Sequence, residues 1–448
     1  MRMLRLLVFS CVAALATPAT ARVTFQFSGA LNLGWTDNVL NTPLARSGAP
    51  FPQSPAIADF FGDIRPSLVL TTSSSRVIQA LIYTFSYTYF FRNSSANAYS
   101  NTLSWSGAFL PSKRTDLLLT VLAAQTEQTT AGFATDPSQP TLLLPGRINT
   151  ASVSLREQLG IDAAQRLRVL QLLAFSGTIP ISPRTLAPNL SADLGATVDY
   201  RWRKAALGLV LNVNYFYAFE VRGAGPIQGD GSIDPNALLT RDQGFFTNSL
   251  IARWRQDFGH FWSSELGLGV LHTITQQGSG SRFGPAANAA LRYLRPEAAL
   301  SLTYAHTTQP SPLLAQLFLS DTVALTASTP LGIESRITLT TTASYSYSRQ
   351  LLTDGGQGAA GHLVTADVSL NYMPIVGLSI YLRGQTSYQR GLDDTPTPLP
   401  TVRRDVILVG ISGFYPATAA AIVPRRQGTR VDGSDRVTIP EPHRRDGN

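Results

Sequence analysis

The segment from Asn189 to Glu220 limits the possible folds of this chain more than any other part of the sequence. Two arms of about twelve residues flank the short polar turn Arg203–Lys204, and apolar and polar residues alternate along both arms. Because successive side chains of a strand point to opposite faces, each arm has one apolar and one polar face. Strands of soluble proteins average about five or six residues, whereas a tilted strand needs about nine to eleven to cross a bilayer. We therefore expect a β-hairpin that spans a membrane.

Aromatic residues at both ends of these arms support the same interpretation. Tyr200 and Trp202 stand beside the turn, and Tyr215, Tyr217 and Phe219 stand at the far end of the apolar face. Tyrosine and tryptophan gather at the two membrane–water interfaces, which accommodate both an apolar ring and a polar group. The hairpin therefore carries the two aromatic belts expected of a membrane-spanning strand pair.

The composition excludes a bundle of membrane helices. Only 14% of the residues are charged, yet after the first twenty residues no apolar run reaches the roughly 18 residues that a spanning helix needs. The single cysteine, Cys11, allows neither a disulfide framework nor a cysteine-based metal site. The net charge of +8 comes mainly from arginines that stand singly along the chain, so we expect no nucleic-acid partner.

The two ends of the chain differ in composition from the part between them. Residues 1–21 combine two early arginines, an apolar run and a small-residue cleavage site, so they are predicted to be a secretory signal peptide. Cys11 stands too early in the apolar run for a lipoprotein site. Residues 416–448 are rich in Arg, Asp, Pro and Gly and are expected to form a disordered periplasmic tail. Residues 22–415 form the predicted barrel domain.

The alternation of the 189–220 hairpin recurs throughout residues 22–415. It predicts about 18 strands, in which short turns alternate with longer loops rich in Gly, Pro, Ser and Asp. An unpaired strand edge in lipid leaves backbone groups unsatisfied at several kcal/mol each, so such strands must close on themselves. Soluble sandwiches, solenoids and propellers have shorter strands or visible repeats. The predicted fold is an all-β, transmembrane antiparallel β-barrel in the outer membrane, with the long loops outside the cell.

The polar parity of the strands predicts which side chains line the barrel lumen. An arginine on the lipid face at mid-membrane costs about 2–4 kcal/mol, so charged strand residues are expected to face inwards. The predicted pore-lining residues are Arg65, Arg156, Asp193, Asp199, Arg201, Asn212, Asn214, Arg253, Arg255, Arg292, Arg336, Asp367, Tyr381, Arg383 and Gln385. This set holds more arginine than aspartate. The lumen therefore either favours anions or contains charges that pair across the wall, and the sequence leaves both open.

No residue pattern points to catalysis. His272 and His306 share the apolar parity of their strands, His260 lies in a predicted turn, His362 opens a strand and His443 belongs to the tail. No Ser/His or Asp/His pair can be placed face to face on the solvent side, so we expect that the protein is not an enzyme. We also expect neither a cofactor nor a metal site.

The last predicted strand carries a first resemblance to known proteins. Asp405 to Tyr415 ends in Phe414-Tyr415 and resembles the aromatic-terminated closing strand of bacterial outer-membrane barrels, which the barrel-assembly machinery generally reads. It departs from that pattern because a tail follows it. The chain as a whole resembles an outer-membrane porin-type barrel.

A second resemblance concerns the end of the first strand. The sequence Gly34-Trp35-Thr36-Asp37-Asn38-Val39 resembles the aromatic-x-Asp-Asn opening of barrels encoded with bacterial exopolysaccharide export systems. It implies a passive conduit that passes a polysaccharide, handed on by periplasmic export machinery, to the cell surface. Two alternatives stay open: a general or substrate-specific diffusion porin for small solutes, and a surface receptor or adhesin. The other expected partners are outer-membrane lipid and the barrel-assembly machinery.

Overall fold

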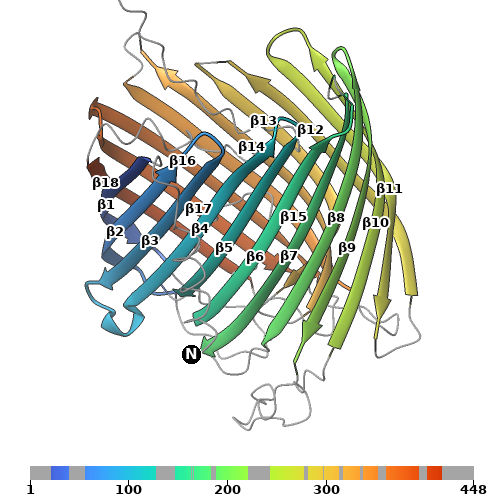
Figure 1. The fold of residues 1–448 in the computed structure, drawn as a ribbon. Helices are drawn as coiled ribbons and strands as arrows, with labels where there is room; N and C mark the ends of the chain where they lie inside the picture. The colour runs from blue at the N-terminus through green and yellow to red at the C-terminus, as the bar shows by residue number, and fades with distance from the viewer. Residues whose placement is uncertain are drawn as a thin grey trace, which may run out of the picture.

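The computed structural model describes residues 22–39, 56–127, 147–162, 164, 166–182, 188–219, 243–276, 281–295, 297–311, 316–332, 336–351, 360–392 and 401–415. These residues form eighteen strands and one short 3-10 helix, η1 (Ser94–Ala96). Figure 1 shows how the strands are arranged around the wall. The strands are β1 (Arg22–Thr36), β2 (Asp59–Ser73), β3 (Val77–Phe90), β4 (Ala98–Ser112), β5 (Thr115–Glu127), β6 (Arg147–Gly160), β7 (Leu167–Ser182), β8 (Asn189–Trp202), β9 (Ala205–Ala218), β10 (Gln243–Phe258), β11 (Trp262–Thr275), β12 (Ser281–Leu294), β13 (Ala299–Ser311), β14 (Gln316–Leu331), β15 (Ile337–Gln350), β16 (Ala360–Ile375), β17 (Leu378–Gly391) and β18 (Val402–Tyr415). Among the described residues, no helix is long and apolar enough to cross a membrane.

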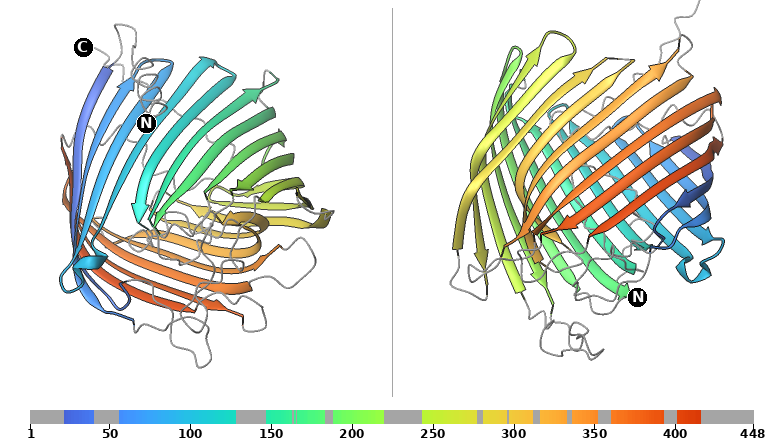
Figure 2. Two further views of the ribbon diagram at one scale, coloured as in Figure 1. Left: turned by 90° about the horizontal axis from the view of Figure 1, so that it is seen from below. Right: turned by 180° about the vertical axis from the view of Figure 1, so that it is seen from behind.

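Each strand pairs antiparallel with the next strand in the chain, and β18 pairs with β1 to close the sheet. The views in Figure 2 show the strands tilted around a common axis as a closed wall. The expected antiparallel barrel of about 18 strands is therefore confirmed, with eighteen. The predicted signal peptide, residues 1–21, and the predicted tail, residues 416–448, lie outside the described residues.

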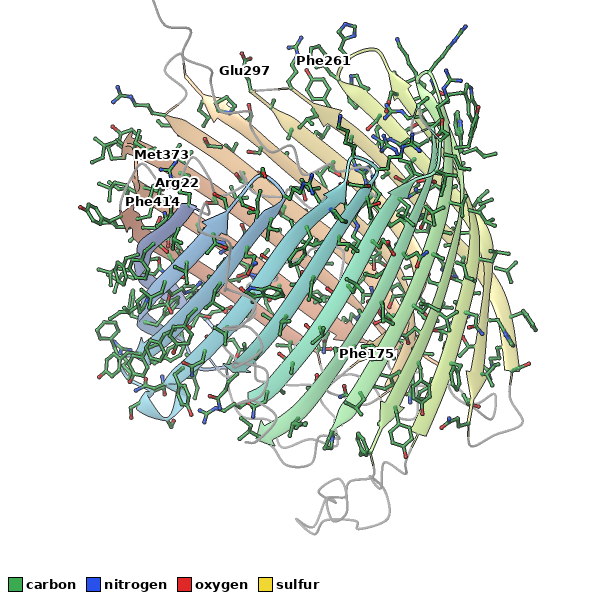
Figure 3. The ribbon with its side chains drawn as sticks, viewed as in Figure 1. Arg22, Phe175, Phe261, Glu297, Met373 and Phe414 are labelled. Carbon is green, nitrogen blue, oxygen red and sulfur yellow. The ribbon has the colours of Figure 1, made fainter. Side chains whose placement is uncertain are left out.

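The alternation of side chains produces one apolar and one polar face of the wall. On β8, Leu190, Leu194 and Val198 are exposed by 51, 54 and 43%, and the odd-numbered residues of the strand point to the other face. Exposed apolar side chains recur on the strands around the barrel, and Figure 3 shows side chains projecting outwards from the wall on the side in view. A continuous apolar surface of this size is stable only in contact with lipid. The chain is an outer-membrane barrel.

The hairpin that dominated the sequence is present as predicted. β8 and β9 pair from Asn189↔Ala218 to Trp202↔Ala205. The turn between them has Arg203 at a φ of 49°, a left-handed conformation that a tight two-residue hairpin requires. On the outer face, Tyr200 and Trp202 stack with ring centroids 6.3 Å apart beside this turn.

One strand begins earlier than the sequence indicated. Arg403 was expected in a loop, but β18 begins at Val402, three residues before the predicted start at Asp405. The backbone of these first residues of β18 pairs with β17, beginning at Gln389↔Val402. It is also bound by residues that follow β1, as described below, and sequence alternation does not reveal such contacts.

Candidate functional site on the inner wall of the barrel

The inner face of the barrel is the face opposite the exposed apolar side chains. Except for Arg336, every residue predicted to line the lumen lies within a strand on this face. Arg253 and Arg255, for example, flank Trp254, which is 42% exposed on the outer face. Arg336 precedes β15 at the short-turn end of the barrel and is exposed.

The structure gathers part of this set with residues that the sequence did not single out. We define the basic cluster as Arg166, Arg168, Arg201, Lys204, Arg253, Arg255 and Arg292. All but Arg292 line, together with Asp199 and Asp257, one open recess. The recess lies beside the Arg203–Lys204 turn and therefore at the short-turn end of β7 to β10.

Three carboxylates hold several of these cations in place. Asp199 is paired with Arg253. Asp257 lies 3.3 Å from Nη2 of Arg201 and 3.6 Å from Nε of Arg255. The third carboxylate, Glu265, lies 3.7 Å from Nη1 of Arg253 and 3.7 Å from Nη1 of Arg292.

The balance of charge in the cluster is positive. The basic cluster holds seven cationic side chains, and the three carboxylates of Asp199, Asp257 and Glu265 lie among them, so this set has a formal excess of four positive charges. The sequence left open whether lumen charges favour anions or pair with one another. The structure shows the second feature, ion pairs across the wall, in a group of residues that holds more cations than carboxylates.

A glycine makes the Arg253–Asp199 pair possible. Gly208 of β9 lies between the two residues in the register Asp199↔Gly208↔Arg253. A Cβ at this position would overlap the carboxylate of Asp199 and would lie 3.1 Å from the carbonyl oxygen of Val198. Arg253 therefore reaches its partner across β9 because no side chain stands between them.

Elsewhere on the inner wall, several of the predicted charged residues have close polar partners. Arg65 Nε lies 2.6 Å from Asp63, and Arg383 Nε lies 2.5 Å from Asp367. Asp193 accepts a hydrogen bond from Asn214.

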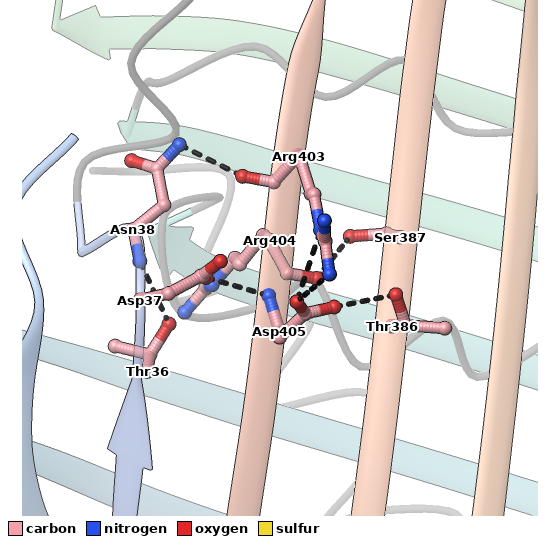
Figure 4. Close-up of polar contacts among 8 residues, drawn as sticks. All are labelled: Thr36, Asp37, Asn38, Thr386, Ser387, Arg403, Arg404 and Asp405. Carbon is pink, nitrogen blue, oxygen red and sulfur yellow. Dashed lines mark hydrogen bonds and ion pairs between the residues drawn. The ribbon is translucent and has the colours of Figure 1, made fainter. Parts of the chain in front are cut away.

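The Gly34–Val39 motif lies at the opposite, long-loop end, where β1 meets β18 (Figure 4). The backbone N–H of Asp405 donates to Asp37 Oδ1 at 2.6 Å, and the N–H of Asp37 donates to the carbonyl of Asp405 at 3.2 Å. The side-chain amide of Asn38 donates to the carbonyl of Arg403 at 2.9 Å. These bonds extend the pairing of the two strands beyond its last register pair, Thr36↔Val406.

Charged side chains surround these backbone bonds. Asp405 itself accepts from Nη2 of Arg403 at 2.8 Å and from Oγ1 of Thr386 at 2.5 Å. Burial raises the pKa of Asp37 above its ordinary value of 3.8, and the neighbouring Asp405 raises it further. Backbone donors and Arg403 oppose the rise.

The outer face carries one acid–base contact that the sequence did not foresee. Nδ1 of His306 lies 2.7 Å from Oδ1 of Asp321, which also accepts a hydrogen bond from the Tyr304 hydroxyl at 2.9 Å. Asp321 shares its parity with the exposed Val323 and Leu325, so this contact lies on the outer face. The prediction that no Asp/His pair meets concerned the solvent side only.

Five residues that shape the basic site were missed: Arg166, Arg168, Lys204, Asp257 and Glu265. Arg166 and Arg168 begin a segment, residues 166–179, that is nearly apolar on both parities, so alternation did not mark them as inward-facing. Arg166 and Arg168 are two residues apart at the start of β7, as Arg253 and Arg255 are on β10. This shared spacing was the one sequence signal that both arginines face the same side of the wall. Only the register, such as Arg168↔Asp199, places them beside the other strands.

Similarity to known proteins is confined to the fold. No protein-family model matches the chain, and no curated protein matches it. Among solved structures, OccK9 (OpdG) of Pseudomonas aeruginosa is 13% identical, with 88% of this chain and 98% of that chain covered and a TM-score of 0.44. The outer membrane protein OpdK of the same organism is 9% identical, with 88 and 99% covered and a TM-score of 0.43. The copper transporter OprC is 8% identical, with 89 and 82% covered and a TM-score of 0.45. At this level of similarity the description of the chain rests on its own structure, a closed eighteen-stranded barrel of the outer membrane.

Proposed function

We propose that the barrel is a passive diffusion channel for small solutes and that it favours anions. The observation that carries this proposal is the basic cluster on the inner wall, with its formal excess of four positive charges beside the short turns. A wall lined by one sign of charge raises the local concentration of ions of the opposite sign. A small anion is therefore drawn to this end of the lumen.

The arrangement of the cluster suits passage more than tight binding. Carboxylates orient Arg201, Arg253 and Arg255, so their guanidinium groups need little ordering when an anion arrives. The same carboxylates weaken the net attraction, which lets an anion leave again. Conduction requires both favourable entry and easy release.

The export of a polysaccharide becomes the second interpretation. It rested on the resemblance of Gly34–Val39 to barrels encoded with export systems. Asp37 and Asn38 bind the backbone of β18, Thr36 Oγ1 accepts from the N–H of Asn38 at 3.4 Å, and Val39 is fully buried. A motif used to join two strands serves any closed barrel, whatever it transports. The receptor or adhesin interpretation depends on long loops that lie mostly outside the described residues.

Ion selectivity in planar bilayers tests the proposal. The reversal potential in a potassium chloride gradient should show anion preference. The variant Arg166→Gln/Arg168→Gln/Lys204→Gln lowers the formal excess from four to one and should shift the reversal potential towards cations. The control Arg147→Gln/Arg390→Gln removes positive charge from the outer face and should leave selectivity unchanged. Equal selectivity in all three proteins would contradict the proposal.

A deletion strain separates the two transport interpretations. Loss of the gene should slow the uptake of small anions such as phosphate or short carboxylates while surface polysaccharide persists. Loss of the surface polymer with unchanged uptake of small anions would instead support export.

A further inference from the structure

The contact between β1 and β18 differs from every other strand pair in this barrel. The other neighbouring strands follow one another in the chain, so each connection restricts how the two strands can align. β1 and β18 are the first and last strands, and they pair from Phe27↔Tyr415 to Thr36↔Val406. We call this contact the seam. In a closed barrel, the stagger summed around the wall sets the tilt and the diameter, so the seam register affects the bore.

Alternation of side chains does not specify this register. On the outer face, β1 presents Leu31 and Leu33, and β18 presents Ile407, Val409 and Ile411, all of them about half exposed. A slip of one residue would turn these side chains into the lumen, but a slip of two residues would keep every apolar side chain in lipid. Another feature must distinguish the observed register from its two-residue neighbours.

The first such feature is a hydrogen bond that crosses β18 on the inner face. The Tyr381 hydroxyl of β17 donates to the side-chain oxygen of Asn32 on β1. Gly410 lies between them in the register Tyr381↔Gly410↔Asn32. A Cβ at Gly410 would lie 2.6 Å from Cζ of Tyr381 and would overlap the Asn32 oxygen. Asn32 is held from its other side by Asp63, which accepts from its amide nitrogen at 2.7 Å.

The second feature is an aromatic ring that crosses β1 in the opposite direction. Phe61 of β2 lies over Gly34, whose register partners are Phe61 and Leu408. A Cβ at Gly34 would lie 2.5 Å from the ring carbon Cζ of Phe61 and 2.9 Å from the carbonyl of Ile407. The ring joins a buried cluster that consists of Val39, Phe61, Phe90, Ala96, Val406 and Leu408.

The third feature is the pair of bonds from Asp37 and Asn38 to the backbone of β18. They join the N–H of Asp405 and the carbonyl of Arg403, so they depend on where β18 begins relative to β1. Together the three features cover the long-loop half of the seam on its inner face and at its end.

We propose that these contacts select the register in which the barrel closes, and through it the stagger and the bore. A two-residue slip would place Leu408 or Ser412 opposite Asn32 in place of Gly410. A side chain would then stand where the Tyr381–Asn32 bond passes, and Asp37 and Asn38 would face backbone groups of β18 other than those of Asp405 and Arg403. The Gly34–Val39 motif is thus a closure element. The inference does not depend on which solute the barrel conducts.

Cysteine cross-linking across the seam tests the register directly. In a Cys11→Ser background, Leu33→Cys/Val409→Cys reports the observed register, and Leu33→Cys/Ile411→Cys reports a slip of two residues. Each pair is oxidised in folded barrels and quantified by mass spectrometry of the cross-linked peptides. In the otherwise unchanged chain, the first pair should dominate.

The variant Asn32→Ala/Asp37→Ala/Asn38→Ala removes the polar selecting contacts without adding bulk and leaves the Phe61 ring over Gly34 in place. Its slipped product should rise about tenfold relative to the native product, and single-channel conductance should become heterogeneous. Gly29→Ala is the matched control, because it lies on the same seam and its Cβ would have ordinary contact, 3.8 Å from the Arg65 carbonyl. The control should keep the native product alone. A triple variant that folds with only the native product and one conductance would overturn the proposal.

If the triple variant does not fold, Gly410→Ala tests the same proposal in its place. This variant keeps Asp37 and Asn38 but blocks the path of the Tyr381–Asn32 bond. The slipped product should again exceed that of Gly29→Ala. A native product alone in Gly410→Ala would likewise overturn the proposal.

Discussion

The Tyr381 hydroxyl donates a hydrogen bond to the side chain of Asn32, although 349 residues separate them in the chain. The bond passes over Gly410 and connects β17 to β1 across the closing strand. The Arg253–Asp199 pair passes over Gly208 of β9 in the same way. Both contacts show glycines of the inner wall acting as gaps through which longer side chains meet.

The crossing at the seam predicts a stability cost for Gly410→Ala. The new methyl group would collide with Tyr381 and Asn32, and overpacking of this kind costs about 1–3 kcal/mol. Urea unfolding in lipid vesicles, followed by tryptophan fluorescence, measures the change. Gly384→Ala is the control, because a Cβ at Gly384 meets nothing within 4 Å. Equal unfolding midpoints for the two variants would show that the crossing does not restrict position 410.

The crossing at the basic cluster predicts that Gly208→Ala separates Arg253 from Asp199. The variant should lose about 1–3 kcal/mol of unfolding free energy, because the new methyl group occupies the position of the Asp199 carboxylate. In an Asp199→Ala background the same substitution should cost clearly less, and a double-mutant cycle measures the difference. An identical cost in both backgrounds would mean that the carboxylate is not the obstacle.

Neighbouring residues on β10 should respond in opposite ways to the same substitution. Arg253→Glu/Arg255→Glu should fold and should turn a reconstituted channel towards cations, because both side chains lie on the inner face. Trp254→Glu should impair folding into lipid, because it places a carboxylate on the exposed outer face. A misfolded double variant beside a well-folded Trp254→Glu channel with altered selectivity would reverse the assignment of faces.

The raised pKa of Asp37 predicts a dependence of stability on pH. The native state binds this proton more tightly than the unfolded chain does, so its contribution to the unfolding free energy is greatest at low pH. That contribution falls as the pH rises from 3.8 through the native pKa. Asp37→Asn keeps an oxygen acceptor for the Asp405 N–H and cannot ionise. Its unfolding midpoints should therefore show a weaker decline across this window, and an unchanged pH profile would exclude Asp37 as the source.

The lengths of the connections predict the orientation in the membrane. Ser95 lies in the exposed η1 segment at the long-loop end, and Lys204 lies in a short turn at the other end. A membrane-impermeant maleimide should label Ser95→Cys on intact cells but should label Lys204→Cys only after the outer membrane is opened. Equal labelling of both on intact cells would contradict this topology.

Strand faces were predictable because they depend on local sequence. The alternation of Leu190, Leu194 and Val198 with polar residues places them on the outer face whatever strands lie beside them. The same argument predicted the inward parity of Arg253 and Arg255 and the turn at Arg203–Lys204. Period-two patterning therefore suffices for the class of fold, the outer belts and the approximate number of strands.

The contacts within the basic cluster and the seam could not be predicted without the closed barrel. Arg168 stands beside Asp199, and Gly410 stands between Tyr381 and Asn32, only because of the register of neighbouring strands. A slip of two residues leaves every side chain on the same face. Alternation therefore does not specify which side chains of neighbouring strands lie opposite one another. The sequence by itself determined which face each residue occupies. The tertiary structure decided which residues meet on that face, because those contacts join strands whose alignment depends on closure of the whole barrel.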